Sequence, residues 1–443
     1  MTIQRVLPIL PIMWLLLAGP GAAQSRPDRA AVRANIDECF TDLESLYKHI
    51  HSHPELSLRE EQTSIRLAKE MKELGFDVTT KVGVHGLVCI YKNGDGPTVM
   101  VRTDMDALPV TEQTGVPYAS KVRTRDRFGN EVGVMHACGH DMHMTCWIGV
   151  AKTLLALKDR WSGTLMFIAQ PAEEIGTGAR LMLEDGLYKR FAKPDYALAL
   201  HCDSRLQAGH VSYSDGLAMA NVDSVEIVVK GRGGHGAAPH TTIDPIVLAA
   251  RMILDFQTIV SREVNPTDPA VVTVGSIHGG TKHNIIPNDV KLQITVRTTK
   301  DEVRKHVLDA IKRIAKATAE AARAPEPEVN IDLSEFTPAL VNDRKLTRRM
   351  ATLFEEILGK ANVQERPPMM GGEDFARYGK EGVPIMMYFL GTIDSKRWDA
   401  AHQPNARPLP SMHSDSYWPT IEPSIRTGVF TMSMAVLDLL GKK

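Results

Sequence analysis

Cysteine is scarce in this chain, and neither sign of charge is in excess. The 443 residues contain five cysteines, too few and too scattered for a framework of disulfide bonds. The 52 Lys and Arg residues are balanced by 53 Asp and Glu residues, which argues against a basic field for nucleic acid or for an anionic membrane. We therefore expect a small-molecule partner, and the chain length favours two domains.

A long apolar run that could span a membrane is also missing. The apolar stretch at residues 6–18 is too short to cross a bilayer. One positive side chain, Arg5, precedes it, and small residues up to Ala23 follow it, which is typical of a secretory signal peptide. We expect residues 1–23 to be cleaved and the protein to be exported, periplasmic or secreted, without later membrane contact. An uncleaved anchor or a wrongly chosen start codon is the alternative.

Strands and helices alternate over residues 24–220, which predicts an α/β domain with a mostly parallel sheet. Apolar periodicity indicates helices at 29–51, 61–74 and 145–157 and strands at 87–91, 98–102, 163–169 and 194–200. Three of these strands are followed by Asp104 and Asp106, by Glu173 and Glu174, and by His201. Because parallel strands end at one edge of a sheet, we expect these side chains to gather there.

Residues 221–334 show a different order of elements. Their pattern is β-α-β-β-α-β, with strands at 223–230, 270–277, 289–298 and 327–333 and helices at 244–260 and 300–322. That is the order of a ferredoxin-like α+β unit. We predict an inserted lid and dimerisation domain at 221–334, between two parts of one catalytic domain at 24–220 and 335–443.

A thiol and an imidazole lie two residues apart in the segment His136-Ala-Cys-Gly-His-Asp141. A polar loop is a poor place for a core cysteine, so we interpret Cys138 and His140 as metal ligands. A thiolate with an imidazole suits Zn or a similar first-row metal. His136 and His143 are close enough in sequence to compete as ligands.

Glu173 and Glu174 closely follow the apolar strand at 163–169. Adjacent residues at a strand end point in different directions, so one carboxylate can hold a metal while the other acts on a water molecule. A solvated surface pair is the alternative. His201 is well placed at a strand end, whereas the sequence around His413 says little for it.

Other candidate side chains have more limited support. Asp106 precedes a Pro-containing turn, and we expect its carboxylate to orient a ligating histidine. The triplet His49, His51 and His53 lies at the end of an amphipathic helix without matching carboxylates, so we expect no metal site there.

The predicted lid carries three residues suited to a substrate. Glycines around His235 suggest a turn from which its imidazole projects. His235 and Asn284 could polarise a substrate carbonyl and hold the oxyanion. Arg297 could bind a substrate carboxylate in a fork.

As an ordered set, the motifs of this chain resemble those of the M20 metallopeptidase family, most closely its amidohydrolase branch. That branch includes hippurate hydrolases, N-acyl-amino-acid amidohydrolases and auxin-conjugate hydrolases. Cys138, where other branches have an acidic residue, points to the amidohydrolases rather than to the dipeptidases. The motifs are His53-Pro-Glu-Leu-Ser57, Asp104-Met-Asp-Ala-Leu-Pro109, His136-Ala-Cys-Gly-His-Asp141, Gln170-Pro-Ala-Glu-Glu174, Gly233-Gly-His-Gly-Ala237, Asn284-Ile-Ile-Pro287 and Gly372-Glu-Asp-Phe375.

The resemblance implies a zinc-exopeptidase-like catalytic domain with a mixed sheet and an inserted lid. It also implies two divalent metal ions, Zn or Mn with Ni or Co as alternatives, and Glu173 as the general base. The lid residues His235, Asn284 and Arg297 would contact the substrate, often across a homodimer interface. The implied ligands are Cys138, His140, Glu174, His201 and His413.

The expected reaction is hydrolysis of the amide bond of an N-acyl amino acid, a small substrate with a carboxylate. A metallo-exopeptidase acting on peptides is one alternative, and an exported binding protein with an inactive metal site is another. A cysteine hydrolase using Cys138 with His140 is disfavoured, because residues two apart on a tight loop are badly placed as nucleophile and base. The chain departs from the family at Gln293–Arg297 and in the long charged loop at 120–132, which we expect to be exposed.

Overall fold

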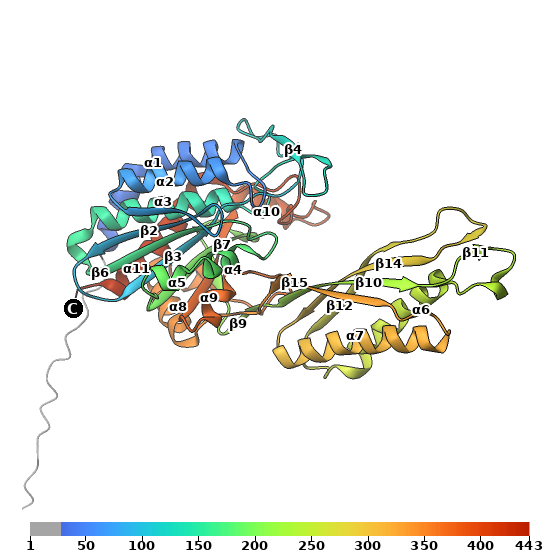
Figure 1. Ribbon diagram of the computed structural model, residues 1–443. Coiled ribbons are helices and arrows are strands. Elements are labelled where there is room, and N and C mark those ends of the chain that lie inside the picture. The colour runs from blue at the N-terminus through green and yellow to red at the C-terminus, as the bar shows by residue number, and fades with distance from the viewer. Residues whose placement is uncertain (1–27, 443) are drawn as a thin grey trace, which may run out of the picture.

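The computed structural model describes residues 28–442, so the expected signal peptide at 1–23 lies outside the described residues. Figure 1 shows a larger domain, with helices over a central sheet, and an elongated lid that extends from it. Within the described part, none of the helices has both the length and the apolar character that a bilayer crossing requires.

The larger domain is built on an eight-stranded sheet with the order β1-β2-β6-β3-β7-β18-β8-β17. The four central strands β6, β3, β7 and β18 run parallel, and the outer pairs β1-β2, β2-β6 and β18-β8 are antiparallel. The expected mixed sheet is therefore confirmed. The strands are β1 (Asp77–Val82), β2 (Gly86–Asn93), β3 (Thr98–Asp104), β6 (Gly163–Gln170), β7 (Tyr196–Gln207), β8 (Val211–Tyr213), β17 (Val363–Glu365) and β18 (Ile385–Ile393).

Helices cover both faces of this sheet, because its central strands are apolar on both sides. In β3, Val99 and Val101 pack under one helical layer and Met100 packs under the other. The first layer consists of α1 (Arg29–Ser52), α2 (Glu61–Glu73), α3 (His140–Ala156), α8 (Arg344–Leu358) and α11 (Ile421–Leu440). The second consists of α4 (Gly178–Glu184), α5 (Leu187–Arg190) and α9 (Ala376–Lys380).

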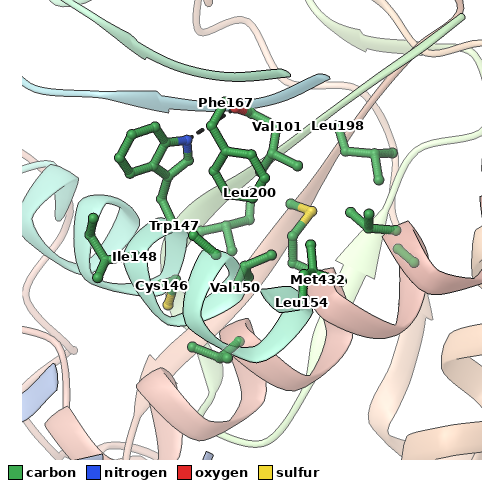
Figure 2. Close-up of a cluster of buried hydrophobic side chains, with 14 of the residues drawn as sticks. Val101, Cys146, Trp147, Ile148, Val150, Leu154, Phe167, Leu198, Leu200 and Met432 are labelled. Atoms are coloured by element: carbon green, nitrogen blue, oxygen red, sulfur yellow. Dashed lines mark hydrogen bonds between the residues drawn. The ribbon is translucent and has the colours of Figure 1, made fainter. Parts of the chain in front are cut away.

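Trp147 anchors α3 to the sheet (Figure 2). Its ring lies 5.4 Å from that of Phe167, centroid to centroid, and its Nε1 donates to the Val101 carbonyl at 3.1 Å. Because the indole N–H and this carbonyl satisfy each other inside the core, the helix has a fixed position over β3 and β6. That position determines where the first residue of α3 lies.

Two elements differ from the sequence prediction in ways that affect the site. Helix α3 begins at His140 and not at 145, because His140, Asp141 and His143 all have buried polar partners that stabilise a polar first turn. Strand β7 continues to Gln207, so His201 lies inside the strand and not at its end. The reason is that β18 pairs alongside β7, through Phe389 opposite His201 and on to Gln207.

The lid is a four-stranded sheet with the order β12-β14-β10-β15 and two helices on one face. Its strands are β10 (Asn221–Lys230), β12 (Ala270–His278), β14 (Asp289–Thr298) and β15 (Glu328–Thr337), and its helices are α6 (Pro245–Thr258) and α7 (Asp301–Ala321). Strand β15 runs three residues past the expected boundary at 334, because Thr337 still pairs with Val222 of β10.

The remaining strands form short two-stranded ribbons. A ribbon of β11 (Gly234–His235) and β13 (Ile285–Ile286) lies at the end of the lid far from the larger domain (Figure 1). The exposed loop predicted at 120–132 contains a hairpin of β4 (Arg123–Arg125) and β5 (Glu131–Gly133). Strand β9 (Leu217–Met219) pairs with β16 (Leu340–Val341), and α10 (Ser395–Ala401) precedes α11.

Candidate active site

The structure brings the five expected metal ligands together at the edge where the central strands end. Two ligand sets share Cys138, and in each set the ligand atoms lie within 4.8 Å of one another. The first ligand set is Cys138, His140 and His201, and the second ligand set is Cys138, Glu174 and His413. Cys138 would therefore help to hold a metal ion in either set.

Local backbone geometry brings the cysteine sulfur close to ligands from distant parts of the chain. Gly139, with φ +81°, adopts a left-handed turn that separates Cys138 from the first turn of α3. Cys138 Sγ lies 3.6 Å from His201 Nε2 and 3.2 Å from His413 Nε2. The His413 backbone N–H donates to the Ala137 carbonyl at 2.9 Å, so the loop before α11 is attached directly to the cysteine loop.

The histidine ligands are oriented by their second nitrogens. His140 Nδ1 lies 2.8 Å from the Asp106 carbonyl oxygen, and His201 Nδ1 lies 2.7 Å from the Cys202 carbonyl oxygen. Each carbonyl accepts the Nδ1 proton, which leaves Nε2 unprotonated for a metal. Asp106 thus lies beside a ligating histidine as expected, with its backbone carbonyl making the closer contact and its carboxylate Oδ1 3.4 Å from His140 Nδ1.

Two buried polar atoms indicate whether these residues are suited to bind a metal ion. His140 Nε2 and Glu174 Oε1 have no hydrogen-bond partner within residues 28–442. Such atoms are rare in folded proteins, and a cation beside them satisfies both. Burial and the nearby Glu174 and Glu173 also raise the pKa of the Cys138 thiol well above its usual range, so a thiolate here needs a cation next to it. The donor set fits a pair of divalent ions.

The turn that carries Glu173 and Glu174 is held by two buried carboxylates. Asp106 accepts the backbone N–H of Glu173 at 3.1 Å and that of Glu174 at 3.0 Å. Glu60 accepts the N–H of Ala172 at 2.8 Å. Ala172 has φ +51°, a strained conformation for alanine that these contacts maintain. The two glutamates are therefore separated by a fixed turn, and not by strand alternation as the sequence suggested.

Glu173 lies beside the ligand sets without belonging to either one. Its Oε2 is 3.9 Å from His140 Nε2, and it forms a close carboxylate group with Glu373 and Asp374. Burial, together with the charges of Glu373 and Glu174, raises the pKa of Glu173 well above its usual range. A carboxylate in this environment is a stronger base than one in water, which suits proton transfer.

The sequence did not assign a role to Arg102, although a charged residue inside an apolar strand was a signal. Its buried guanidinium contacts Asp104 at 2.6 Å, Glu373 at 2.9 Å and Asp374 at 3.2 Å. Glu373 and Asp374 are part of a motif that the family resemblance quoted without a role. Arg102 thus neutralises three buried carboxylates near Glu173, those of Asp104, Glu373 and Asp374.

The other histidines of the cysteine loop have different surroundings. His143 Nδ1 lies 2.7 Å from Asp104 Oδ1, and its Nε2 accepts the Cys202 N–H at 2.8 Å, so neither nitrogen is left for a metal. His136 is buried and belongs to none of the candidate ligand groups among the described residues. His51 contacts Asp141 at 2.6 Å and Glu112 at 3.0 Å, which is a buried ion pair beside the cysteine loop.

A cavity of about 600 Å³ opens next to the ligands. The lid contributes Val222, Ser224 and Arg297 to its wall. Arg297 is half-buried and has no ion-pair partner among the described residues, and burial lowers its pKa. His235 and Asn284 do not line this cavity, because the β11–β13 ribbon that holds them lies at the far end of the lid (Figure 1). Their expected contact with a substrate is therefore not made within the cavity of the same chain, which leaves the cavity of a second copy.

Residues 100–411 match a family model described as Peptidase family M20/M25/M40. The chain belongs to peptidase family M20. Thermostable carboxypeptidase 2 of Saccharolobus solfataricus is 38% identical over 354 residues, which cover 79% of this chain and 86% of the relative. N-acetyl-L-cysteine deacetylase of Bacillus subtilis is 36% identical over 369 residues, which cover 82% of this chain and 83% of the relative.

The crystal structure of the Bacillus subtilis YxeP protein, described as a dinuclear metal binding peptidase from the M20 family, is also similar. It has a TM-score of 0.70 and 30% identity, over 93% of this chain and 99% of that one. This M20 protein is a metal-dependent hydrolase that acts on amide bonds, as the ordered motifs predicted.

The shared position of Cys138 leads to a prediction about metal content. Cys138→Ser should weaken binding of both ions, by at least roughly 100-fold in affinity, because a hydroxyl replaces a thiolate common to both ligand sets. Calorimetric titration with Zn²⁺ or Mn²⁺ measures the change. Cys39→Ser, at a partly exposed thiol outside both sets, is the control and should bind like the wild type. Equal affinity in the two variants would contradict the assignment.

The buried pair at His51 predicts a pH-dependent stability. Burial alone would lower its pKa, but hydrogen bonds to Asp141 and Glu112 raise the pKa of His51 to about 9, from an ordinary value of 6.5. The protonated imidazole therefore stabilises the fold fully below pH 6.5, and this stabilisation is lost as the pH rises toward 9. The stability difference between wild type and His51→Gln should shrink by roughly 3 kcal/mol over that range.

Denaturant unfolding at several pH values measures this difference. His53→Gln, which removes an exposed imidazole two residues away, controls for the loss of a histidine. A wild-type advantage over His51→Gln that stays constant with pH would show that His51 is neutral in the folded protein.

Proposed function

We propose that this M20 protein hydrolyses the amide bond of N-acyl amino acids. The observation that carries the proposal is the position of Glu173 beside the two ligand sets that share Cys138 and in the wall of the cavity. The same cavity contains the guanidinium of Arg297, which has no ion-pair partner among the described residues. A base next to the metals and a cation for a carboxylate are what such a substrate requires. The similar deacetylase of Bacillus subtilis acts, by its name, on an N-acetyl amino acid.

The cofactors in this proposal are two divalent ions, Zn or Mn with Ni or Co as alternatives. When bound, they supply Lewis acidity, which polarises an amide carbonyl and makes a water molecule more acidic. Glu173 removes a proton from the attacking water, and the water oxygen bonds to the carbonyl carbon. Glu173 then gives the proton to the departing nitrogen as the carbon–nitrogen bond breaks.

Arg297 fixes the amino-acid end of the substrate. It projects from β14 into the cavity, and a Cβ built on Gly372 would lie 3.7 Å from its Nη1. The guanidinium thus lies next to Gly372 in the cavity wall. A planar fork of N–H donors matches a carboxylate and orients the amide beside Glu173.

His235 and Asn284 act, in our proposal, on the substrate of a second copy of the chain. Both are exposed at the far end of the lid, next to Ile285, which is itself 49% exposed. A homodimer formed through the lid would bring this ribbon to the partner's cavity, where the imidazole and the amide would stabilise the oxyanion. The similarity to M20 amidohydrolases supports this arrangement.

A metallo-exopeptidase is the second candidate, supported by the similarity to a carboxypeptidase. The same ligands and the same base would serve, and Arg297 would bind the C-terminal carboxylate of a peptide. Rates on N-acyl amino acids and on dipeptides, measured side by side, distinguish the two. We also propose export, supported by the N-terminal signal pattern, and N-terminal sequencing of the mature protein would test cleavage near Ala23.

Glu173→Gln tests the assignment of the base. The variant should keep its metal but lose turnover of N-acetyl amino acids by about 10²- to 10⁴-fold, because an amide cannot carry the proton. Metal content and kcat are measured on the same preparation. Glu335→Gln, in the same cavity but away from the ligand sets, should retain most of its activity. Normal turnover by Glu173→Gln would exclude Glu173 as the base.

A mixed dimer tests whether His235 acts on the partner's substrate. His235→Ala alone should lose about 10²- to 10³-fold in kcat, the usual effect of removing an oxyanion donor. Co-expression with Glu173→Gln should restore activity, because one cavity of the mixed dimer then has both an intact Glu173 and the partner's intact imidazole. Mixed dimers as inactive as either parent would show that His235 does not act across an interface.

A further inference from the structure

The cavity wall contains two guanidinium groups besides that of Arg297. Arg127, from the β4–β5 hairpin, is paired with Glu335 at 2.7 Å. Arg205 lies in β7, four residues after His201, and its side chain is 65% exposed. Its Nε is 3.4 Å from Asp203, and its Nη2 rests 3.0 Å from the sulfur of Met369. Arg205 therefore has donors that no close carboxylate of the described chain occupies.

Positive charge is in excess around Arg205 and Arg297. Asp203 makes its closer ion pair with Arg366, which also lies over the Phe389 ring, so Arg205 shares a carboxylate that is already neutralised. On the lid, Asp223 is bound by both edge nitrogens of Arg304, which leaves Arg297 without a partner among the described residues.

Two carboxylates, Asp203 and Asp223, thus lie near four guanidinium groups. Arg366 and Arg304 make the closest ion pairs, and the remaining two, Arg205 and Arg297, line the cavity. Of the other carboxylates in the wall, Glu335 pairs with Arg127 and Glu373 pairs with Arg102, while Glu173 and Glu174 lie at or beside the ligand sets. Two unmatched cations in one cavity favour a ligand with two negative charges.

Arg205 and Arg297 lie at opposite ends of the short segment from Met369 to Gly372. Arg205 contacts Met369 at one end, and Arg297 lies beside Gly372 at the other. Three residues span at most about 10 Å, and the bend at Met370 makes this segment shorter. The two guanidinium groups can therefore bind opposite ends of one small molecule, and the Met219 and Met369 side chains between them suit an apolar linker.

We propose that the substrate carries a second carboxylate, which Arg205 binds while Arg297 binds the first. This inference rests on the proposed hydrolysis of N-acyl amino acids and names the substrate class. The second carboxylate belongs either to an acidic amino acid, on the amine side, or to a dicarboxylic acyl group. Both have the same chemistry, an anion that accepts a fork of N–H donors from Arg205.

The experiment compares matched pairs of ligands that differ only in the second charge. N-acetyl-L-glutamate against N-acetyl-L-glutamine tests the amine side, and N-succinyl-L-alanine against N-butanoyl-L-alanine tests the acyl side. Binding is measured by calorimetry on Mn²⁺-loaded Glu173→Gln, and kcat/KM on the Mn²⁺-loaded wild type. In at least one pair, the dianion should bind and react about 10- to 100-fold better, the usual effect of a charge-assisted hydrogen bond.

Arg205→Gln should remove this preference mainly by weakening binding of the dianion, with a much smaller effect on the monoanion, and Arg205→Lys should keep part of the preference. Arg127→Gln is the matched control, since it removes a guanidinium of the same cavity that is already paired, and the preference should persist. The proposal would be overturned if the wild type had the same affinity and kcat/KM for dianion and monoanion in both pairs. A preference for the dianion that persists in Arg205→Gln would also overturn it.

Binding and catalysis separate this inference from the proposed function. If the dianion binds through Arg205 but no N-acyl amino acid is hydrolysed, the second anion site is supported and the reaction is wrong. If monoanionic N-acyl amino acids are hydrolysed as efficiently as the dianions, the reaction is supported and the second anion site is overturned.

Discussion

The burial of many acidic groups at one edge of the sheet is the constraint on which the site depends. A buried carboxylate is costly unless a cation or several N–H groups lie beside it. Arg102 neutralises one part of the group, and the backbone of the 172–174 turn solvates another. Glu174 and the Cys138 sulfur are left without either, so bound cations would offset the cost of burying them. The acidic groups are Asp104, Asp106, Glu173, Glu174, Glu373 and Asp374.

This constraint connects the catalytic turn to the lid. Gly176 follows Glu174 by two residues, and a side chain there would collide with Thr337 at the end of β15. The turn that positions Glu173 is therefore packed directly against the strand by which the chain leaves the lid. Metal ligands, base and lid form one continuous structure, which explains why the inserted domain can contribute Arg297 to a cavity in the larger domain.

The sequence predicted the parts of the site that depend on local chemistry. Cys138 and His140 stood out because a thiol and an imidazole lie two residues apart in a polar loop, and the two glutamates stood out because they follow an apolar strand. The sequence missed the helical start at His140, since three polar residues in five look like a loop until their buried partners are known. It also left open whether His235 and Asn284 act in the cavity of their own chain or in that of a second copy. Where the lid points, and whether a second chain lies against it, depends on domain packing that local periodicity does not encode.

The cysteines have two different roles in this fold, as buried core thiols and as a candidate metal ligand. Burial raises the pKa of Cys89, Cys146 and Cys202, so these thiols are rarely ionised and exchange slowly with disulfides. Only at Cys138 do the neighbouring histidines and Glu174 provide a place for a cation that would stabilise the thiolate. A coordinated sulfur is also protected from oxidation. Five unpaired cysteines are thus compatible with the export that we propose, because four are buried in the core or at the metal ligands and the pKa of the fifth, Cys39, is raised as well.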